Sequence, residues 1–212
     1  MNDTIASHPS AQRLEDVIRL IAQTCVENET YFSDLDAVAG DGDFGYSLAR
    51  GFENVLEEWD RYDRADVSTL IQQVATTMSA RIGGTSGPIW GTAFLRAAIS
   101  VKGKQEITQA DVVDLLRSAI EGIKKRGGAD LGDKTLLDSL IPLTEAIAAD
   151  LDSDSATAAR RAATVARKTA EDTSRLEARR GRASYTGVRS IGSPDPGAIA
   201  MAVLAERIAD EW

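Results

Sequence analysis

One glycine-rich segment holds the residues of this sequence best suited to chemistry. Residues 34–45 read DLDAVAGDGDFG, in which Asp41 and Asp43 stand two positions apart between glycines. Glycine lets the backbone turn tightly, so several carboxylates of the segment can converge. Converging carboxylates repel one another unless a cation neutralises them. An all-oxygen ligand set favours Mg²⁺, with Ca²⁺ or Mn²⁺ as alternatives.

Two other readings of this segment are weighed. An EF-hand loop counted from Asp41 would place Gly45 at position 5 and Phe52 at position 12, so the bidentate glutamate is missing and this reading fails. A solvated acidic turn that caps the following helix remains the plain structural alternative.

Residues 83–88, GGTSGP, form a second loop with the composition of an anion site. Free backbone amides, two hydroxyl donors and the start of a helix all favour a bound phosphate. The structural alternative is a glycine that ends one helix followed by a serine that caps the next.

Residues 127–135, GGADLGDKT, come close to the phosphate-loop pattern G-x-x-x-x-G-K-[ST]. Asp133 stands between the glycine and Lys134, and the preceding segment is predicted to be a helix rather than a strand, so a P-loop NTPase is rejected. Lys134 is left with two balanced readings, a contact with phosphate or an ion pair with Asp133 or Asp138.

Residues 174–195 carry five arginines in an otherwise acidic chain. Arginine on a long irregular loop is suited to bidentate contacts with phosphate. Arg182, within the string GRASY, is the best candidate for such a contact. For Arg175 and Arg179 we expect ordinary surface pairing with acidic residues.

Several classes of function are excluded by composition. The chain has one cysteine, Cys25, and one histidine, His8, so a zinc site or a catalytic triad would have to be built around a polar tail. Cys25 falls on an apolar helix face and is expected to be structural. A net charge of −9 argues against nucleic acid. There is no long apolar run and no secretory signal, so we expect no membrane span and a cytoplasmic location.

Helical periodicity runs through most of the sequence and predicts about eight helices and no strand. We expect one all-α domain over residues 1–212, an antiparallel up-and-down bundle or barrel. Apolar stripes mark the helices at 14–25, 48–59, 67–78, 89–101, 112–123, 136–141, 155–173 and 199–208. In such a bundle the four unusual loops follow alternate helices, so they would gather at one end and build a single site.

These four loops, in this order, resemble the L subunit, the nucleotide-binding domain, of dihydroxyacetone kinases. The strings that carry the resemblance are AGDGDFG at 39–45, GGTSGP at 83–88, GDKTLLDSL at 132–140, and GRASYTGVRSIG with DPGA across 181–198. The resemblance covers nearly the whole chain. It implies an eight-helix antiparallel barrel that binds ADP or ATP at one end.

The same resemblance implies roles for particular residues. Asp36, Asp41 and Asp43 would bind two Mg²⁺ ions that bridge the nucleotide phosphates, and Arg182 would act at the phosphates. The other positions implied to contact nucleotide are Phe44, Gly45, Ser47, Thr85, Ser86, Gly127, Leu136, Asp195 and Gly197. The family usually has histidine at position 44 and asparagine at position 47, so polar contacts near the phosphates are lost here.

The implied activity is that of a phosphoryl-donor half-enzyme. Family kinases hold dihydroxyacetone on a histidine of a separate K subunit or domain, and some recharge a bound ADP from a phosphocarrier of the phosphotransferase system, whereas others use free ATP. The sequence does not identify the ketose that is phosphorylated. A homodimer is possible, and the sequence does not decide the oligomeric state. A nucleotide-loaded module that binds a regulator is the first alternative, and a metal-dependent all-α hydrolase is the second.

Overall fold

The computed structural model describes residues 9–212, so the N-terminal tail with His8 lies outside the described residues. The described part contains nine α-helices and no strand. The helices are α1 (Pro9–Glu27), α2 (Glu29–Ala37), α3 (Phe44–Glu58), α4 (Val67–Arg81), α5 (Ser86–Ser100), α6 (Gln109–Gly127), α7 (Leu137–Ala148), α8 (Ser155–Asp172) and α9 (Pro196–Glu211). Three short 3₁₀ segments, η1 (Trp59–Arg61), η2 (Thr173–Arg175) and η3 (Arg182–Ser190), lie between them.

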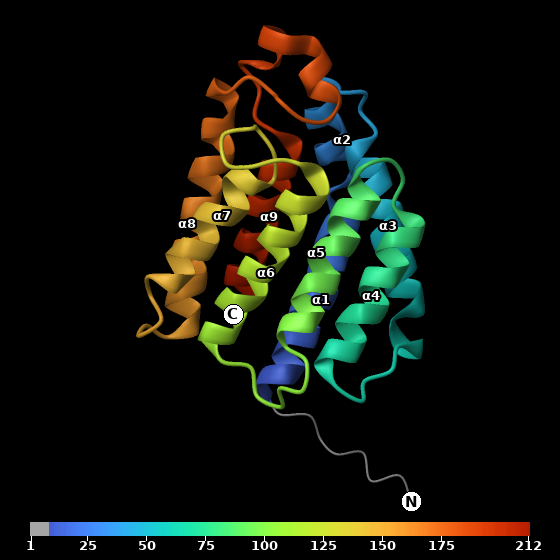
Figure 1. The fold of residues 1–212 in the computed structure, drawn as a ribbon, viewed down its shortest axis with the longest axis vertical. Helices are drawn as coiled ribbons and strands as arrows, with labels where there is room; N and C mark the ends of the chain where they lie inside the picture. The colour runs from blue at the N-terminus through green and yellow to red at the C-terminus, as the bar shows by residue number, and fades with distance from the viewer. Residues whose placement is uncertain (1–8) are drawn as a thin grey trace, which may run out of the picture.

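Eight of these helices form a closed antiparallel ring. Starting from α1, each long helix packs on the next through α3, α4, α5, α6, α7 and α8, and α9 returns to α1. The connections alternate between the two ends, so the four Gly-, Asp- and Arg-rich segments lie together at the upper end in Figure 1. The predicted eight-helix barrel is therefore confirmed.

Helix α2 is an additional element that the apolar pattern does not predict. Residues 33–37, which we expected in a loop, are helical, and only Asn28 separates α2 from α1. Of its nine residues only Phe32 is buried. A short helix with one buried apolar residue gives no stripe, and α2 instead lies across the upper end of the barrel against α3 and α9.

Alanine explains how α8 fits into the ring. Ala158, Ala162, Ala166 and Ala170 recur every four residues and are all buried. Small side chains let this helix lie close to α7 and α9. Elsewhere larger side chains fill the interior, among them Phe32, Phe52, Leu70 and Met78.

Local sequence patterns predict a capping box of Thr108 and Asp111, a helix start at Asp195-Pro196, and a kink or restart of a helix at Pro142. Thr108 and Asp111 form the expected capping box at the start of α6. Asp195 caps α9, with Pro196 in the first turn. Pro142 lies inside α7 and does not restart the helix, which continues to Ala148.

Cys25 is fully buried, as expected, and burial raises the pKa of its thiol. None of the helices in residues 9–212 is long and apolar enough to cross a membrane.

Helix α3 packs closely against the end of α4 at Gly51. A Cβ added at Gly51 would lie 2.0 Å from Cγ1 of Ile82, a side chain that is itself buried. We expect Gly51→Ala to lower the free energy of unfolding by about 1–3 kcal/mol, because a packed core cannot absorb the extra methyl group. Denaturant titration measures the change.

Gly83→Ala is the matched control, since its nearest neighbour would be Ser47 Oγ at 4.0 Å. Equal stability of the two variants would show that α3 and Ile82 can separate at little cost.

Candidate metal and phosphate site

Three carboxylates converge where α2 passes into α3. Asp36 belongs to the last turn of α2, Asp41 lies in the connecting turn, and Asp43 is the residue just before α3. One oxygen atom from each carboxylate lies within 4.8 Å of the other two. Asp36 is partly buried, whereas Asp41 and Asp43 are exposed. The sequence-predicted ligands are thus brought together, at a spacing that one or two cations can bridge.

Asp36 also folds the turn that carries the other two aspartates. Its Oδ2 accepts the backbone N–H of Gly42 at 2.9 Å and that of Phe44 at 3.3 Å. Gly42 has a φ of +76°, a left-handed conformation that disfavours other residues. At Gly40 an added Cβ would lie 2.2 Å from Asp36 Oδ1. Glycine is therefore required at both positions if the carboxylates are to meet.

The electrostatics of this cluster favour a bound cation. Burial, followed in importance for Asp43 by the neighbouring charge of Asp41, raises the pKa of both Asp36 and Asp43. The two backbone N–H groups that Asp36 accepts oppose the shift of its pKa without cancelling it. Carboxylates that resist ionisation in this way gain most from a divalent cation, which stabilises all three charges at once.

Arg182 is placed at the same cluster by the turn η3. Its Nε lies 2.5 Å from Oδ2 of Asp41. The guanidinium also lowers the pKa of Asp43, although burial and Asp41 outweigh it. An arginine from position 182 thus reaches the carboxylates of residues 36–43, and its other nitrogen atoms remain available for a phosphate.

The hydroxyl loop lies beside the carboxylate segment. Gly83 approaches Ser47 of α3, to whose Oγ an added Cβ would be 4.0 Å away. Thr85 is exposed and precedes α5, yet its side chain makes no capping hydrogen bond. Ser86 is the first residue of that helix. A hydroxyl that does not cap its own helix can donate to a phosphate at the helix N-terminus.

Phe44 and Gly45 have packing roles in the structure. Phe44 contacts Phe32 with ring centroids 6.2 Å apart. Gly45 is buried, and an added Cβ would lie 2.1 Å from the carbonyl oxygen of Glu29. Glycine at 45 therefore lets α3 cross close to α2. Contacts of these two residues with nucleotide stay a prediction.

The remaining residues predicted to contact nucleotide lie at the end of α6 and next to the starts of α7 and α9. They are Gly127, Leu136, Asp195 and Gly197. An added Cβ at Gly197 would lie 3.3 Å from Cβ of Leu136 and 3.0 Å from Oδ2 of Asp195, so these three residues are neighbours. Asp195 accepts the N–H of Ala198 at 2.7 Å, and burial raises the pKa of its carboxyl to about 7. Gly127 ends α6 close to Ile89 of α5.

Lys134 does not form the ion pair with Asp133 or Asp138 that was one of its two predicted roles. Its amine donates to the backbone carbonyls of Leu176, Ser190 and Ser193. Asp138 instead accepts the N–H groups of Gly132 and Thr135. The sequence offers no signal for these contacts, because the carbonyls that Lys134 binds belong to residues far along the chain.

Three other arginines of the segment have acidic partners, as we expected for two of them. Arg175 pairs with Asp172, and both Arg179 and Arg180 lie near Asp133. Arg182 differs from them because its partner, Asp41, belongs to the carboxylate cluster.

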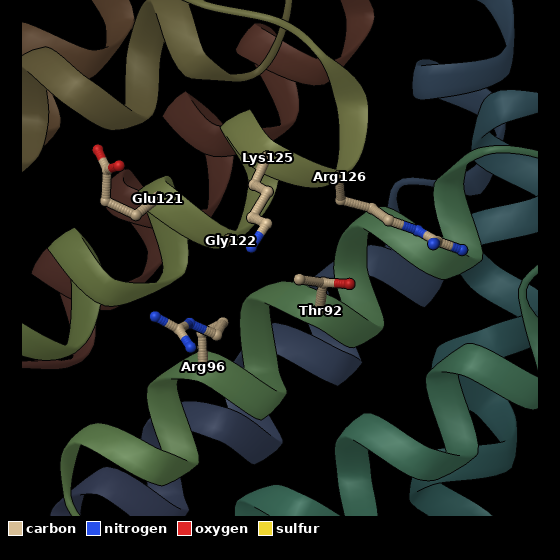
Figure 2. Close-up of a pocket in the computed structure, with 6 residues that line it drawn as sticks. All are labelled: Thr92, Arg96, Glu121, Gly122, Lys125 and Arg126. Carbon is tan, nitrogen blue, oxygen red and sulfur yellow. The ribbon is translucent and has the colours of Figure 1, made fainter.

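A separate cavity of about 500 Å³ opens between α5 and α6 (Figure 2). Its lining residues are Thr92, Arg96, Glu121, Gly122, Lys125 and Arg126. None of them belongs to the predicted site. The candidate metal and phosphate site is instead an open surface at the end of the barrel, shaped by loops.

Comparison with known proteins agrees with this geometry. The DAK2 domain model matches residues 38–210. The chain is 34% identical over 181 residues to the ADP-binding subunit DhaL of the PEP-dependent dihydroxyacetone kinase of Escherichia coli, covering 84% of this chain and 86% of that one. It is 37% identical to the corresponding PTS-dependent subunit of Lactococcus lactis, covering 86% of this chain and 88% of that one.

Longer proteins are also similar. An L-erythrulose 1-kinase of Mycolicibacterium smegmatis is 34% identical over 96% of this chain, which spans 36% of the relative. Among solved structures, the dihydroxyacetone kinase of C. freundii in complex with AMP-PNP and Mg²⁺ superposes with a TM-score of 0.77 and 25% identity, covering all of this chain and 36% of that one. This chain thus spans about a third of these two proteins.

The carboxylate cluster generates a direct prediction about metal binding. Asp41→Ala and Asp43→Ala should each weaken Mn²⁺ binding at least roughly tenfold, because each removes one of three hard oxygen ligands. The helices should persist, since both side chains are exposed. Titration calorimetry with Mn²⁺ and circular dichroism measure the two effects.

Asp34→Ala is the control, because Asp34 is exposed on α2 but lies outside the cluster. An equal loss of Mn²⁺ affinity in this control, or a collapse of helicity in the other two variants, would contradict the assignment.

Proposed function

The chain belongs to the DAK2 domain family of dihydroxyacetone kinase subunits, and on that premise we propose that it is a single-domain phosphoryl-donor subunit for a short ketose. In this proposal it binds ADP or ATP through Mg²⁺ at the upper end of the barrel. It passes a phosphoryl group to a ketose held on a separate K subunit.

The convergence of Asp36, Asp41 and Asp43 next to Arg182 is the observation that carries the proposal. Oxygen ligands at this spacing suit Mg²⁺, and the DhaL relatives are named ADP-binding. Two Mg²⁺ ions could be shared among three carboxylates and the phosphates of a nucleotide. When bound, Mg²⁺ would neutralise charge on the transferred phosphoryl group and its leaving oxygen.

The chain's own residues supply the remaining parts of a phosphoryl-transfer site. Thr85 and Ser86 would donate hydrogen bonds to phosphate oxygens at the start of α5. Arg182 would contact the transferred group, where its planar fork stabilises charge that spreads over the phosphoryl oxygens. In the transfer, the bond from the γ-phosphorus to the bridging oxygen of ATP breaks and ADP leaves, while a bond to the ketose hydroxyl oxygen forms and the hydroxyl proton is released to water.

The adenine end is assigned to the end of α6 and the starts of α7 and α9. Gly127 and Leu136 would line it, with Asp195 and Gly197 closing it from α9. Phe44 and Ser47 stand where family members usually carry more polar side chains, so phosphate binding here depends more on the metal and Arg182. Glycine at position 45 lets α3 approach α2 closely, and in this proposal Phe44 and Ser47 lie near the phosphates.

Exposed apolar side chains at the same end support a partner subunit. Val38 is 67% exposed, Tyr185 87% and Val188 70%, and all three belong to segments that carry or flank the carboxylates and Arg182. Apolar side chains around a polar site favour docking of another protein. The K subunit would cover them and bring its bound ketose to the phosphates.

Relatives indicate two variants of donor and substrate. The subunits from Escherichia coli and Lactococcus lactis are named PEP-dependent and PTS-dependent, so a phosphocarrier that recharges bound ADP is one option. The similar proteins from Mycolicibacterium smegmatis are named erythrulose kinases, which extends the substrate class to four-carbon ketoses. We therefore assign a short ketose as the acceptor and leave its carbon number to assay.

Nucleotide binding should depend on a divalent cation. Without metal, the three carboxylates would repel the phosphates of ADP, so we expect affinity to fall at least about a hundredfold when EDTA is present. Calorimetric titration of ADP with Mg²⁺ and with EDTA gives the two dissociation constants. Equal affinities would show that nucleotide binds away from the aspartates.

Ketose phosphorylation should require the second subunit. The described residues contain no histidine to hold a carbonyl substrate, and His8 lies outside them. The isolated chain with Mg-ATP and dihydroxyacetone or erythrulose should therefore give no phosphorylated ketose. Adding a K subunit, together with a phosphocarrier system in a parallel reaction, should start turnover.

Mass spectrometry of the ketose product separates the outcomes. Turnover by the isolated chain would contradict a half-enzyme, and inactivity with every K subunit and donor tested, despite ADP binding, would favour a regulatory nucleotide module.

A further inference from the structure

Lys134 is a buried cation at the upper end of the barrel with an unusual set of contacts. Its side chain is almost fully buried, with a relative exposure of 3%. Its Nζ lies 3.1 Å from the carbonyl oxygen of Leu176 and 2.7 Å from that of Ser193, and it also donates to the carbonyl of Ser190. An ammonium group has three protons to donate. All three are used on backbone carbonyls, so Lys134 has none left for a phosphate.

The loop that carries Lys134 is built to hold it in this position. Lys134 has a φ of +61°, and among residues 9–212 it is the single non-glycine residue with positive φ. Such a conformation is unfavourable for lysine and persists where surrounding contacts fix it. Asp138 supplies those contacts by accepting the N–H groups of Gly132 at 2.6 Å and Thr135 at 2.7 Å, on either side of Lys134.

The three carbonyls lie on both sides of the turn that bears Arg182. Leu176 precedes η3, Ser190 is its last residue, and Ser193 follows it. One amine therefore joins the two ends of the segment 176–193, which we call the arginine segment. Between these ends Arg182 extends to Asp41 of the carboxylate cluster. Figure 1 shows this segment, in orange, across the upper end of the barrel near α2.

Other bonds hold the same segment, but each of them joins two points. Arg179 donates its backbone N–H to the carbonyl of Asp133 at 3.1 Å, and Gly192 donates to that of Ser174 at 2.8 Å. Ala178 donates to the hydroxyl of Ser190 at 2.9 Å. Lys134 is the one side chain in these contacts that gathers three acceptors, and it is also charged. Removing its amine would leave buried carbonyls without a donor.

We propose that Lys134 is a positioning residue that clamps both ends of the arginine segment and thereby holds Arg182 at the carboxylate cluster. The clamp is a property of the chain itself. Its consequence for phosphoryl transfer rests on the proposed function.

Lys134→Met tests the clamp because methionine keeps the length and the apolar stem but removes the charge and the donors. The variant with intact helices should lose hydrogen-exchange protection across residues 176–193. Trypsin should cut after Arg175, Arg179, Arg180, Arg182 or Arg189 at least about tenfold faster, since local opening exposes these bonds. Lys168→Met is the matched control, because Lys168 lies on exposed α8 surface and pairs with Asp172 alone.

Lys134→Arg is the second variant, which keeps the charge and several donors. It should restore part of the protection of residues 176–193. Unchanged protection and unchanged cleavage in Lys134→Met would overturn the clamp. Loss of the whole fold in both variants would also overturn it, because Lys134 would then stabilise the barrel and not this segment.

A double-mutant cycle separates positioning from simple stability. ADP affinity with Mg²⁺ is measured for Arg182→Lys, Lys134→Met and the double variant. If Lys134 acts through Arg182, the loss caused by Arg182→Lys should be several-fold smaller in the Lys134→Met background. Fully additive losses would overturn the link to Arg182. If ADP binds none of these proteins, including the wild type, the proposed function fails while the protease and exchange results still decide the clamp.

Discussion

Repulsion among Asp36, Asp41 and Asp43 is the constraint on which the functional end of this protein depends. Three carboxylates with oxygens within 4.8 Å of one another are unfavourable unless positive charge is supplied. The protein supplies part of it, through two backbone N–H groups on Asp36 and the guanidinium of Arg182 on Asp41. Burial, followed for Asp43 by the neighbouring charge of Asp41, nevertheless raises the pKa of both Asp36 and Asp43. In the proposed function, a divalent cation would supply the rest of the positive charge.

The barrel makes that arrangement possible because it brings segments that are distant in the sequence together at one end. Each long helix packs on its successor, so every second connection returns to the same side. Helix α9 packs on both α1 and α2, so residues 195–197 at its start lie at the same end of the barrel as α2. The core that fixes these positions consists of buried apolar side chains, and Asp41, Asp43 and Arg182 are not among them. Ligand residues can therefore be polar and exposed without loss of the fold.

Much of the fold could be predicted from the sequence, because helices that pack on a core produce a regular spacing of apolar residues. The capping box at Thr108 and the Asp195–Pro196 start of α9 follow from local chemistry, and the structure confirms both. Helix α2 could not be predicted in this way, since it buries only Phe32. The contacts of Lys134 could not be predicted from the sequence either. Its positive φ and its carbonyl acceptors, 42 to 59 residues away, depend on tertiary packing.

The charged residues at the upper end of the barrel form an inner and an outer layer with different roles. In the inner layer Asp138 accepts two backbone N–H groups, Asp195 accepts that of Ala198, and Lys134 donates to three carbonyls. These contacts with the backbone set the positions of the loops. In the outer layer Asp41, Asp43 and Arg182 are exposed, and their only strong partners are one another. Such groups keep free oxygens and N–H donors that can be shared with a metal and a phosphate. The sequence motifs contain both layers in the same short strings, and burial is what separates the residues that shape the site from those that can bind.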